Sequence, residues 1–309
     1  MIFLNKFLLL TLTAGITVGS LCGCAGKKSG GDVPATTAPT ASENSSAVVT
    51  TALQITTSPE SQPEMRDIKP AAGTYVYDNA NVLDTQSFSA CNDYTGWLYE
   101  EYLINAAVVT ASDLGGKTSY EYAAETYEKL YSGRGSGLLL LIDNVSGSDI
   151  LYKTGSCARY ILDSDQNEVF YWATKDIVEG KYKEAVLSLM KLGEKCPEHI
   201  FDNGGIFTNE EVGELERLIT SGKNKLSLLA TSNSTDKTNE DVLRNYYERH
   251  YKDGDGIMLM LDTEHRSIIA HSAGQLPSGA DAALKKAGES ASKGDYISAV
   301  KTAIEAMKG

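Results

Sequence analysis

The chain has 309 residues, of which 42% are hydrophobic, so it is long enough for two ordinary domains with a core each. Its 41 Asp and Glu residues exceed its 28 Lys and Arg residues and give a formal net charge of -13. This charge argues against nucleic-acid binding and against electrostatic docking on anionic lipid. An acidic balance most often serves solubility, and cation binding is the alternative that it leaves open.

Residues 1–23 have the layout of an export signal. One early positive charge, Lys6, precedes an apolar stretch that ends in small residues and is too short for an ordinary membrane-spanning helix. The sequence Leu21-Cys22-Gly23-Cys24 resembles the lipobox of bacterial lipoproteins. The resemblance implies cleavage before Cys24 and a lipid on its sulfur, which would anchor the exported chain to the outer face of the cytoplasmic membrane or to a periplasm-facing membrane. The alternative is a cleaved secretory signal that leaves Cys24 free.

Residues 24–72 are expected to form a linker. The segment is rich in Thr, Ser, Ala, Pro and Gly and has almost no large apolar residue. It cannot bury enough surface to offset the entropy of an ordered chain. We therefore predict a disordered tether of roughly 45 residues with a span of a few tens of ångströms, which holds the folded part clear of the bilayer.

The first folded region is predicted over residues 73–195. Asp84 is a good N-cap for a helix that runs to about Leu103. The apolar run Gly137–Ile142 has the length of a strand buried on both faces, and the turn residues after it predict an antiparallel return over Asp149–Thr154. The other elements expected here are a strand at Asn105–Ala111, a helix at Ser119–Tyr131 capped by Thr118, and helices at Gln166–Val178 and Lys181–Leu192.

The second region, residues 200–309, repeats this order of elements. The offset between matched residues is constant within elements and falls between them, which is the result expected of duplication followed by loop shortening. We therefore predict two copies of one domain. The offset is 124 at Asp78 and Asp202, 119 at Asp143 and Asp262, and 114 at Tyr182 and Tyr296.

Several of these features together resemble the TPM domain, the family that includes thylakoid lumen proteins and many bacterial envelope proteins. They are the Asp-containing opening before the first helix, the run GLLLLID at 137–143, the return strand ending in Gly155, and EGKYKEAV at 179–186. The resemblance covers residues 73–195 well and 200–309 more weakly. It implies an α/β fold class, with two similar three-layer α/β/α domains, each around a short mixed sheet. It also implies an unsettled activity, because members are assigned divalent-cation binding, acid phosphatase activity or accessory roles in assembling and repairing membrane complexes.

Carboxylates are predicted to gather at one edge of the first sheet. Strands Asn105–Ala111 and Gly137–Ile142 are joined through a helix, so they run parallel and their C-terminal ends share an edge. Open α/β sheets bind ligands at this edge. Oxygen ligands without His or Cys suit Ca²⁺ or Mg²⁺, bound weakly with a Kd on the order of 10⁻⁴ to 10⁻³ M. The predicted metal ligands are Asp78, Asp84, Asp113 and Asp143 in the first region and Asp202 and Asp262 in the second. Asn233 is the residue of the second region that corresponds to Asp113.

A purely structural role for these aspartates stays open. Asp before a helix is usually a cap, and Asp after a buried strand usually makes a turn. Asp163 and Asp165 follow the return strand, whose end faces the opposite edge of the sheet, so they would join the other carboxylates only if their loop doubled back. The second region lacks that loop.

Three cysteines lie in the predicted folded part, at Cys91, Cys157 and Cys196. Their number argues against a disulfide framework, and their spacing argues against a structural zinc site. One disulfide among the three is open, and the sequence does not choose the pair.

The leading functional hypothesis is a non-enzymatic, lipid-anchored module that binds divalent cations weakly, uses no other cofactor and presents a face to an envelope protein. The rival is a metal-dependent acid phosphatase at the same edge, in which Asp78 and Asp143 hold the cation that polarises a phosphoryl group. Against the rival, no motif places Lys, Arg or His to meet the phosphate charge. A third hypothesis is a structural extracellular repeat without a ligand.

Overall fold

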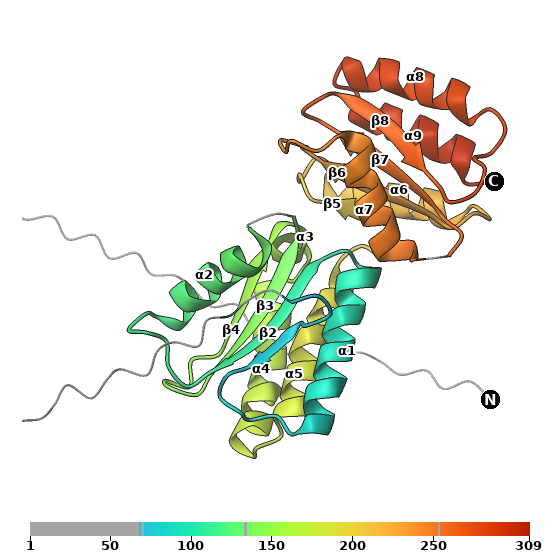
Figure 1. The fold of residues 1–309 in the computed structure, drawn as a ribbon. Coiled ribbons are helices and arrows are strands. Elements are labelled where there is room, and N and C mark those ends of the chain that lie inside the picture. The colour runs from blue at the N-terminus through green and yellow to red at the C-terminus, as the bar shows by residue number, and fades with distance from the viewer. Residues whose placement is uncertain (1–67, 69–70, 133–134, 253) are drawn as a thin grey trace, which may run out of the picture. The chain divides into compact units, whose positions relative to one another are not determined.

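The computed structural model describes residue 68 and residues 71–132, 135–252 and 254–309. These residues form two four-stranded sheets with flanking helices (Figure 1), which confirms the predicted α/β fold class. The predicted export signal, the lipidation residue Cys24 and nearly all of the predicted tether lie outside the described residues.

Four strands form the first sheet: β1 (Val76–Asp78), β2 (Asn105–Ala111), β3 (Gly137–Asp143) and β4 (Ile150–Thr154). Their order across the sheet is β1-β2-β3-β4. The first three strands run parallel, and β4 returns antiparallel to β3, as the turn residues between them predict. All seven residues of β3 are buried, because helices cover both faces of this strand.

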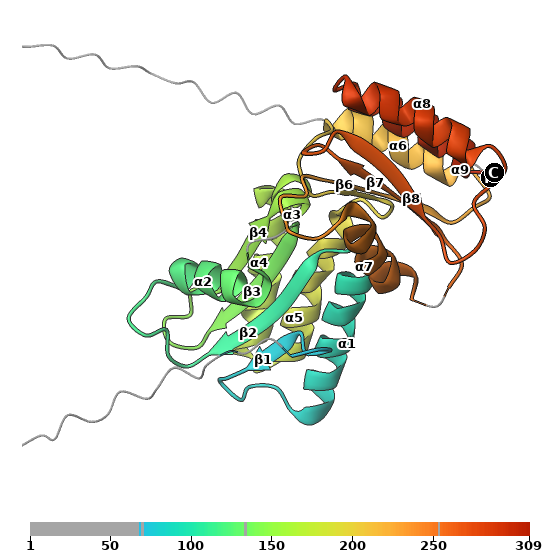
Figure 2. The same ribbon diagram turned by 45° about the horizontal axis from the view of Figure 1, so that its top comes forward.

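Five α-helices and one 3₁₀ helix surround this sheet: α1 (Thr85–Glu101), α2 (Ser119–Tyr131), α3 (Gly155–Tyr160), α4 (Asp163–Val178), α5 (Tyr182–Met190) and η1 (Lys191–Lys195). One face of the sheet packs against α1, α3, α4 and α5 through a cluster that includes Leu98, Ala173 and Val186. The other face packs against α2 through Tyr122 and Tyr127. The first domain therefore has the three predicted layers, and Figure 2 shows α2 apart from the other helices.

Two of these helices differ from the sequence prediction. The helix α3 was not predicted, because its six residues are too few to show a helical period. The helix α4 begins at Asp163, three residues before the predicted start at Gln166. Asp163 and Asp165 lie in its first turn, where a carboxylate is stabilised by the positive end of the helix dipole.

The second sheet contains β5 (Ile200–Asp202), β6 (Leu226–Thr231), β7 (Ile257–Asp262) and β8 (Ser267–His271), in that order. Its strand directions match those of the first sheet, with three parallel strands and an antiparallel return. One face packs against α6 (Asn209–Thr220), α8 (Ala280–Ser292) and α9 (Tyr296–Met307), and the other against α7 (Asn239–Tyr251). The origin of the two regions by duplication stays a prediction.

Side chains cap the starts of the helices α1, α2 and α6, and the caps at Asp84 and Thr118 were predicted from the sequence. The Asp84 side chain accepts a hydrogen bond from the Ser87 N–H at the start of α1. Thr118 and Thr208 each form a complete capping box at the start of α2 and α6, with Glu121 and Glu211 at the third helical position. In both boxes the hydroxyl and the carboxylate satisfy N–H groups that the helix itself leaves without an acceptor.

Candidate functional site at the carboxyl edge of the first sheet

The C-terminal ends of β1, β2 and β3 meet at one edge of the first sheet. Asp78, the last residue of β1, pairs in register with Thr110, and Asp143, the last residue of β3, pairs with Ala111. Asp113 follows the end of β2 by two residues. This edge is where ligands bind in open parallel sheets, so its carboxylates are the first candidates for a site.

The Asp78 carboxylate ties two strands to the loop that precedes α1. Its Oδ1 accepts hydrogen bonds from Thr110 Oγ1 at 2.6 Å and from the Val82 N–H at 3.1 Å, and its Oδ2 accepts one from the Leu83 N–H at 3.0 Å. Because Leu83 immediately precedes Asp84, these bonds also hold the N-cap of α1 at this edge. Asp78 therefore has a structural role in the loop.

The Asp143 carboxylate is buried, and four hydrogen bonds reach its two oxygens. Oδ1 accepts from the N–H groups of Val145 and Ser146 at 2.8 and 3.1 Å, and Oδ2 accepts from the hydroxyls of Ser119 and Ser146 at 2.6 Å each. Burial opposes ionisation, but the hydrogen bonds outweigh it and lower the pKa of Asp143 below its ordinary value. The two oxygens of Asp143 together offer about four lone-pair positions, and the four hydrogen bonds occupy all of them.

Asp149 lies beside Asp143 and was not predicted as a site residue. Its Oδ1 accepts a hydrogen bond from the Asp143 N–H at 2.9 Å. Burial raises the pKa of Asp149, and the neighbouring Asp143 charge adds to the rise, although the hydrogen bond opposes it. The two carboxyl groups thus have pKa values displaced in opposite directions, a pattern also found in acid–base pairs. The sequence offered no signal for Asp149 beyond its place at the start of the predicted return strand.

Asp113 is half-buried and has an oxygen that the described residues leave open. Its Oδ1 accepts from the Gly115 N–H at 2.8 Å, which closes the turn after β2. Its Oδ2 receives no hydrogen bond from the described part of the chain. Asp113 lines a cavity of about 530 Å³ together with the N-terminus of α2 and the β3–β4 turn. The polar lining comprises Asp113, Lys117, Thr118, Ser119, Ser146 and Ser148.

The lysine that lines this cavity already has an acidic partner. Lys117 pairs with Glu125, whose side chain is 60% exposed. Ser119 and Ser146 both donate their hydroxyls to Asp143, so neither hydroxyl proton is available to a ligand. Tyr120 and Val145 line the same cavity and are 61% and 57% exposed. The cavity therefore offers one open carboxylate oxygen beside exposed apolar surface.

In the second domain, Asp202 and Asp262 hold the corresponding loops. Asp202 accepts from the N–H groups of Ile206 and Phe207 and pairs with Arg159 at 3.1 Å. Asp262 accepts from the Asn233 N–H at 3.0 Å and also contacts His265. Burial opposes the ionisation of Asp262, but these bonds outweigh it and lower its pKa. The predicted partner Asn233 is itself bonded through its amide to the Lys237 carbonyl and to Asn239.

Asp163 and Asp165 do not join the carboxylates at the edge. The end of β4 lies in register with the start of β3, so the helix that follows begins at the opposite edge of the sheet. Asp163 pairs with Lys153 at 3.2 Å, and Asp165 pairs with Lys195 at 3.1 Å. Their loop does not double back to the carboxyl edge.

The aspartates at the carboxyl edge do not fit a Ca²⁺ or Mg²⁺ site that is built from several carboxylates. Ca²⁺ requires 6–8 oxygen ligands, and hydrogen-bond donors already use most of the oxygens of Asp78 and Asp143. Over residues 71–132, 135–252 and 254–309, no group of three or more His, Cys, Asp or Glu side chains is arranged to hold a metal ion. Cation binding stays a prediction, and Asp113 is the ligand that the geometry leaves accessible.

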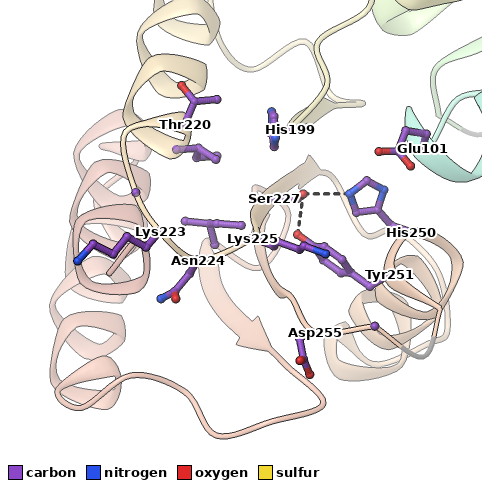
Figure 3. A pocket seen from close by; sticks show the side chains of 14 residues that line it. Glu101, His199, Thr220, Lys223, Asn224, Lys225, Ser227, His250, Tyr251 and Asp255 are labelled. Atoms are coloured by element: carbon purple, nitrogen blue, oxygen red, sulfur yellow. Dashed lines mark hydrogen bonds between the residues drawn. The ribbon is translucent and has the colours of Figure 1, made fainter.

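A second cavity, of about 440 Å³, lies at the start of β6 (Figure 3). The Ser227 hydroxyl lies 3.2 Å from His250 Nε2 and 2.9 Å from the Tyr251 hydroxyl. Burial lowers the pKa of His250, and its Nδ1 faces the Glu100 carbonyl at 3.2 Å. A neutral imidazole could accept the serine proton, but Ser227 has no exposed surface for a substrate to reach. No local sequence pattern indicates this contact.

One of three comparisons with known proteins supports the assignment of the first domain. No curated protein matches the chain. One similar solved structure is the solution NMR structure of the N-terminal domain of a protein from P. gingivalis, with 18% identity, a TM-score of 0.36, and coverage of 42% of this chain and 92% of that chain. The family model described as "TPM domain" matches residues 76–192. The resemblance predicted for the first region is therefore confirmed, and residues 76–192 are a TPM domain.

Proposed function

We propose that this protein is an exported, lipid-anchored module that binds an envelope protein and, weakly, a divalent cation, without catalysing a reaction. Cys24 would carry the lipid and hold the chain at the outer face of the cytoplasmic membrane or at a periplasm-facing membrane. No helix in the described part of the chain has the length and apolar character needed to cross a bilayer.

One observation carries the non-enzymatic proposal: two of the hydroxyls at the carboxyl edge are already bonded to the buried Asp143 carboxylate. Asp143 accepts four hydrogen bonds, and two of them come from the hydroxyls of Ser119 and Ser146, which are two of the hydroxyl side chains that line the cavity. A catalytic hydroxyl needs an adjacent base that takes its proton as the oxygen attacks the substrate. Here the base is an ionised carboxylate with a lowered pKa, so it is a weak proton acceptor.

Binding of a protein partner is supported by the surface of α4. Large apolar side chains are usually covered in monomeric proteins, and exposed Trp and Tyr are typical of interaction surfaces. On α4, Tyr171 and Trp172 are 73% and 60% exposed, and Val178 is 82% exposed. The acidic residues Glu168 and Asp176 on the same helix disfavour an anionic lipid surface, so we propose a protein as the occupant.

The cation proposal predicts a stabilisation that depends on Asp113. With a Kd of about 1 mM, 10 mM CaCl₂ should stabilise the folded full chain by about 1.4 kcal/mol, or about 3–5 °C in Tm. We expect Asp113→Asn to abolish this shift, because it removes the open carboxylate oxygen. The measurement is thermal melting in detergent, with NaCl at equal ionic strength as the salt control.

Asp163→Asn is the matched control, since Asp163 is exposed and lies at the opposite edge. It should leave the calcium shift intact. A wild-type protein without a calcium-specific shift, or an undiminished shift in Asp113→Asn, would contradict cation binding at this edge.

A phosphatase is the second candidate, and the opposed pKa shifts of Asp143 and Asp149 are the observation that favours it. Asp149 could donate a proton to the leaving group of a phosphomonoester at acid pH. Steady hydrolysis of p-nitrophenyl phosphate by the wild-type chain, lost in Asp149→Asn, would replace the non-enzymatic proposal with this one. We expect no turnover above that of the Asp149→Asn variant.

A further inference from the structure

Two cysteine sulfurs meet in the core of the first domain. Cys157 Sγ and Cys196 Sγ lie 3.5 Å apart, although the residues are 39 positions apart in the chain. Cys157 belongs to α3 and is fully buried, and Cys196 directly follows η1 and is 5% exposed. A disulfide requires a sulfur separation of about 2.0 Å, so the two atoms need to approach by about 1.5 Å.

Cys91 provides a comparison within the same core. It belongs to the same buried cluster, but no other sulfur contacts it among the described residues. Burial raises the pKa of Cys91 to about 11 and raises the pKa of Cys157 well above its ordinary value. Since the thiolate is the reactive form, these thiols react little in the folded protein and more readily while the chain folds.

We propose that Cys157 and Cys196 are joined by a disulfide bond in the exported protein. The thiolate of Cys196, the more exposed of the two residues, attacks a disulfide reagent of the glutathione or thiol–disulfide oxidoreductase class and releases one thiol of that reagent. The Cys157 thiolate then attacks the mixed disulfide and releases the second thiol. The protein loses two electrons and two protons, and the reagent is reduced to two thiols.

The bond closes a loop that contains α4, α5 and η1, the helices that cover much of one face of the first sheet. A cross-link of this loop length restricts the unfolded chain and is expected to raise the Tm by about 10 °C. It also attaches α3 to the segment that leads into β5. Formation of the bond in the cell rests on the proposed export, because cytosolic thiols are kept reduced.

A peptide map of the full chain tests the pairing directly. The reduced, unfolded protein is refolded to equilibrium in a glutathione buffer at about −200 mV, blocked with N-ethylmaleimide in denaturant and digested with trypsin. Cleavage after Lys153, Arg159, Lys195 and Arg217 isolates residues 154–159 and 196–217, each with one cysteine. We expect these two peptides to be joined in most molecules, two hydrogens lighter than their sum, and the Cys91 peptide to be alkylated. Alkylation of all three cysteines, or a bond that includes Cys91, would overturn the proposal.

Melting of the wild-type chain in both redox states supplies the second readout and depends on no variant. Dithiothreitol should lower the Tm by about 10 °C, and an unchanged Tm would overturn the stabilising role. Cys91→Ala should keep the joined peptide, whereas Cys157→Ser should lose it and become insensitive to dithiothreitol. The glutathione reaction needs neither export nor calcium, so failure of the proposed function would leave these results unaltered.

Discussion

Replacing Asp143 with alanine is expected to lower the free energy of unfolding by about 3–4 kcal/mol, the largest loss among the aspartates at the carboxyl edge. Four donors would lose their acceptor at once: the N–H groups of Val145 and Ser146 and the hydroxyls of Ser119 and Ser146. Asp143 and Ser119 are buried, so water replaces the lost bonds poorly. Urea unfolding of the full chain at pH 7 measures the change.

Asp113→Ala is the matched control at the same edge. It loses one hydrogen bond, to the Gly115 N–H in an exposed turn, and should cost about 1 kcal/mol or less. Equal losses for the two variants would contradict the assignment of Asp143 as the main hydrogen-bond acceptor of this edge.

Gly137→Ala is expected to destabilise the protein by about 2–3 kcal/mol through overpacking. An added Cβ would lie 1.8 Å from the Tyr127 hydroxyl oxygen and 2.4 Å from two ring carbons. Tyr127 cannot easily withdraw, because it is fully buried, its hydroxyl is bonded to Thr154 at 3.1 Å, and its ring contacts Tyr131. Thermal or urea unfolding reports the loss.

Gly213→Ala is the control, because an added Cβ meets no neighbour there. Gly213 is an exposed residue of α6, and no atom lies within 4 Å of the added Cβ. Alanine there should stabilise the protein by about 0.5–1 kcal/mol, because it reduces the entropy of the unfolded chain. If Gly137→Ala has the same free energy of unfolding as the wild type, Tyr127 moves aside without cost and the predicted overpacking is wrong.

The strands β2, β3 and β4 and their directions were predictable because their signals are local, whereas the three-residue strands β1 and β5 were not predicted. The run of residues 137–142 is apolar without alternation, which requires a strand covered on both faces, and the structure buries it completely. The capping residues Asp84, Thr118 and Thr208 mark helix starts through side chains that reach only three residues ahead. The helix α3 escaped prediction because six residues are shorter than two helical turns.

The chemistry of the edge was less predictable than its location. Topology alone places the C-terminal ends of β2 and β3 together, so Asp113 and Asp143 could be assigned to one edge. The first helix runs antiparallel to β2, and this direction placed Asp78 at the same edge. The number of hydrogen bonds that each carboxylate accepts depends on the conformation of the loops, and the sequence does not reveal that conformation. Asp149 and the contact between Cys157 and Cys196 arise from tertiary packing between distant segments and leave no local pattern.

The opposed pKa shifts also set the dependence of stability on pH. Asp143 has a lowered pKa in the folded state, so its contribution is present above the unfolded value near 3.8 and is lost as pH falls through the folded pKa. Asp149 has a raised pKa, so its ionisation destabilises the folded state above that pKa, and this cost disappears as pH falls through about 3.8.

Titration of the two carboxyl groups by ¹³C NMR is the most direct test of the view that this edge uses its aspartates to hold loops in place. The shift of each Cγ carbon is followed against pH in the folded protein. We expect Asp143 to titrate below 3.8 and Asp149 above it. An Asp143 that titrates at or above the pKa of Asp149 would show that its four donors are not in place, and would contradict the account.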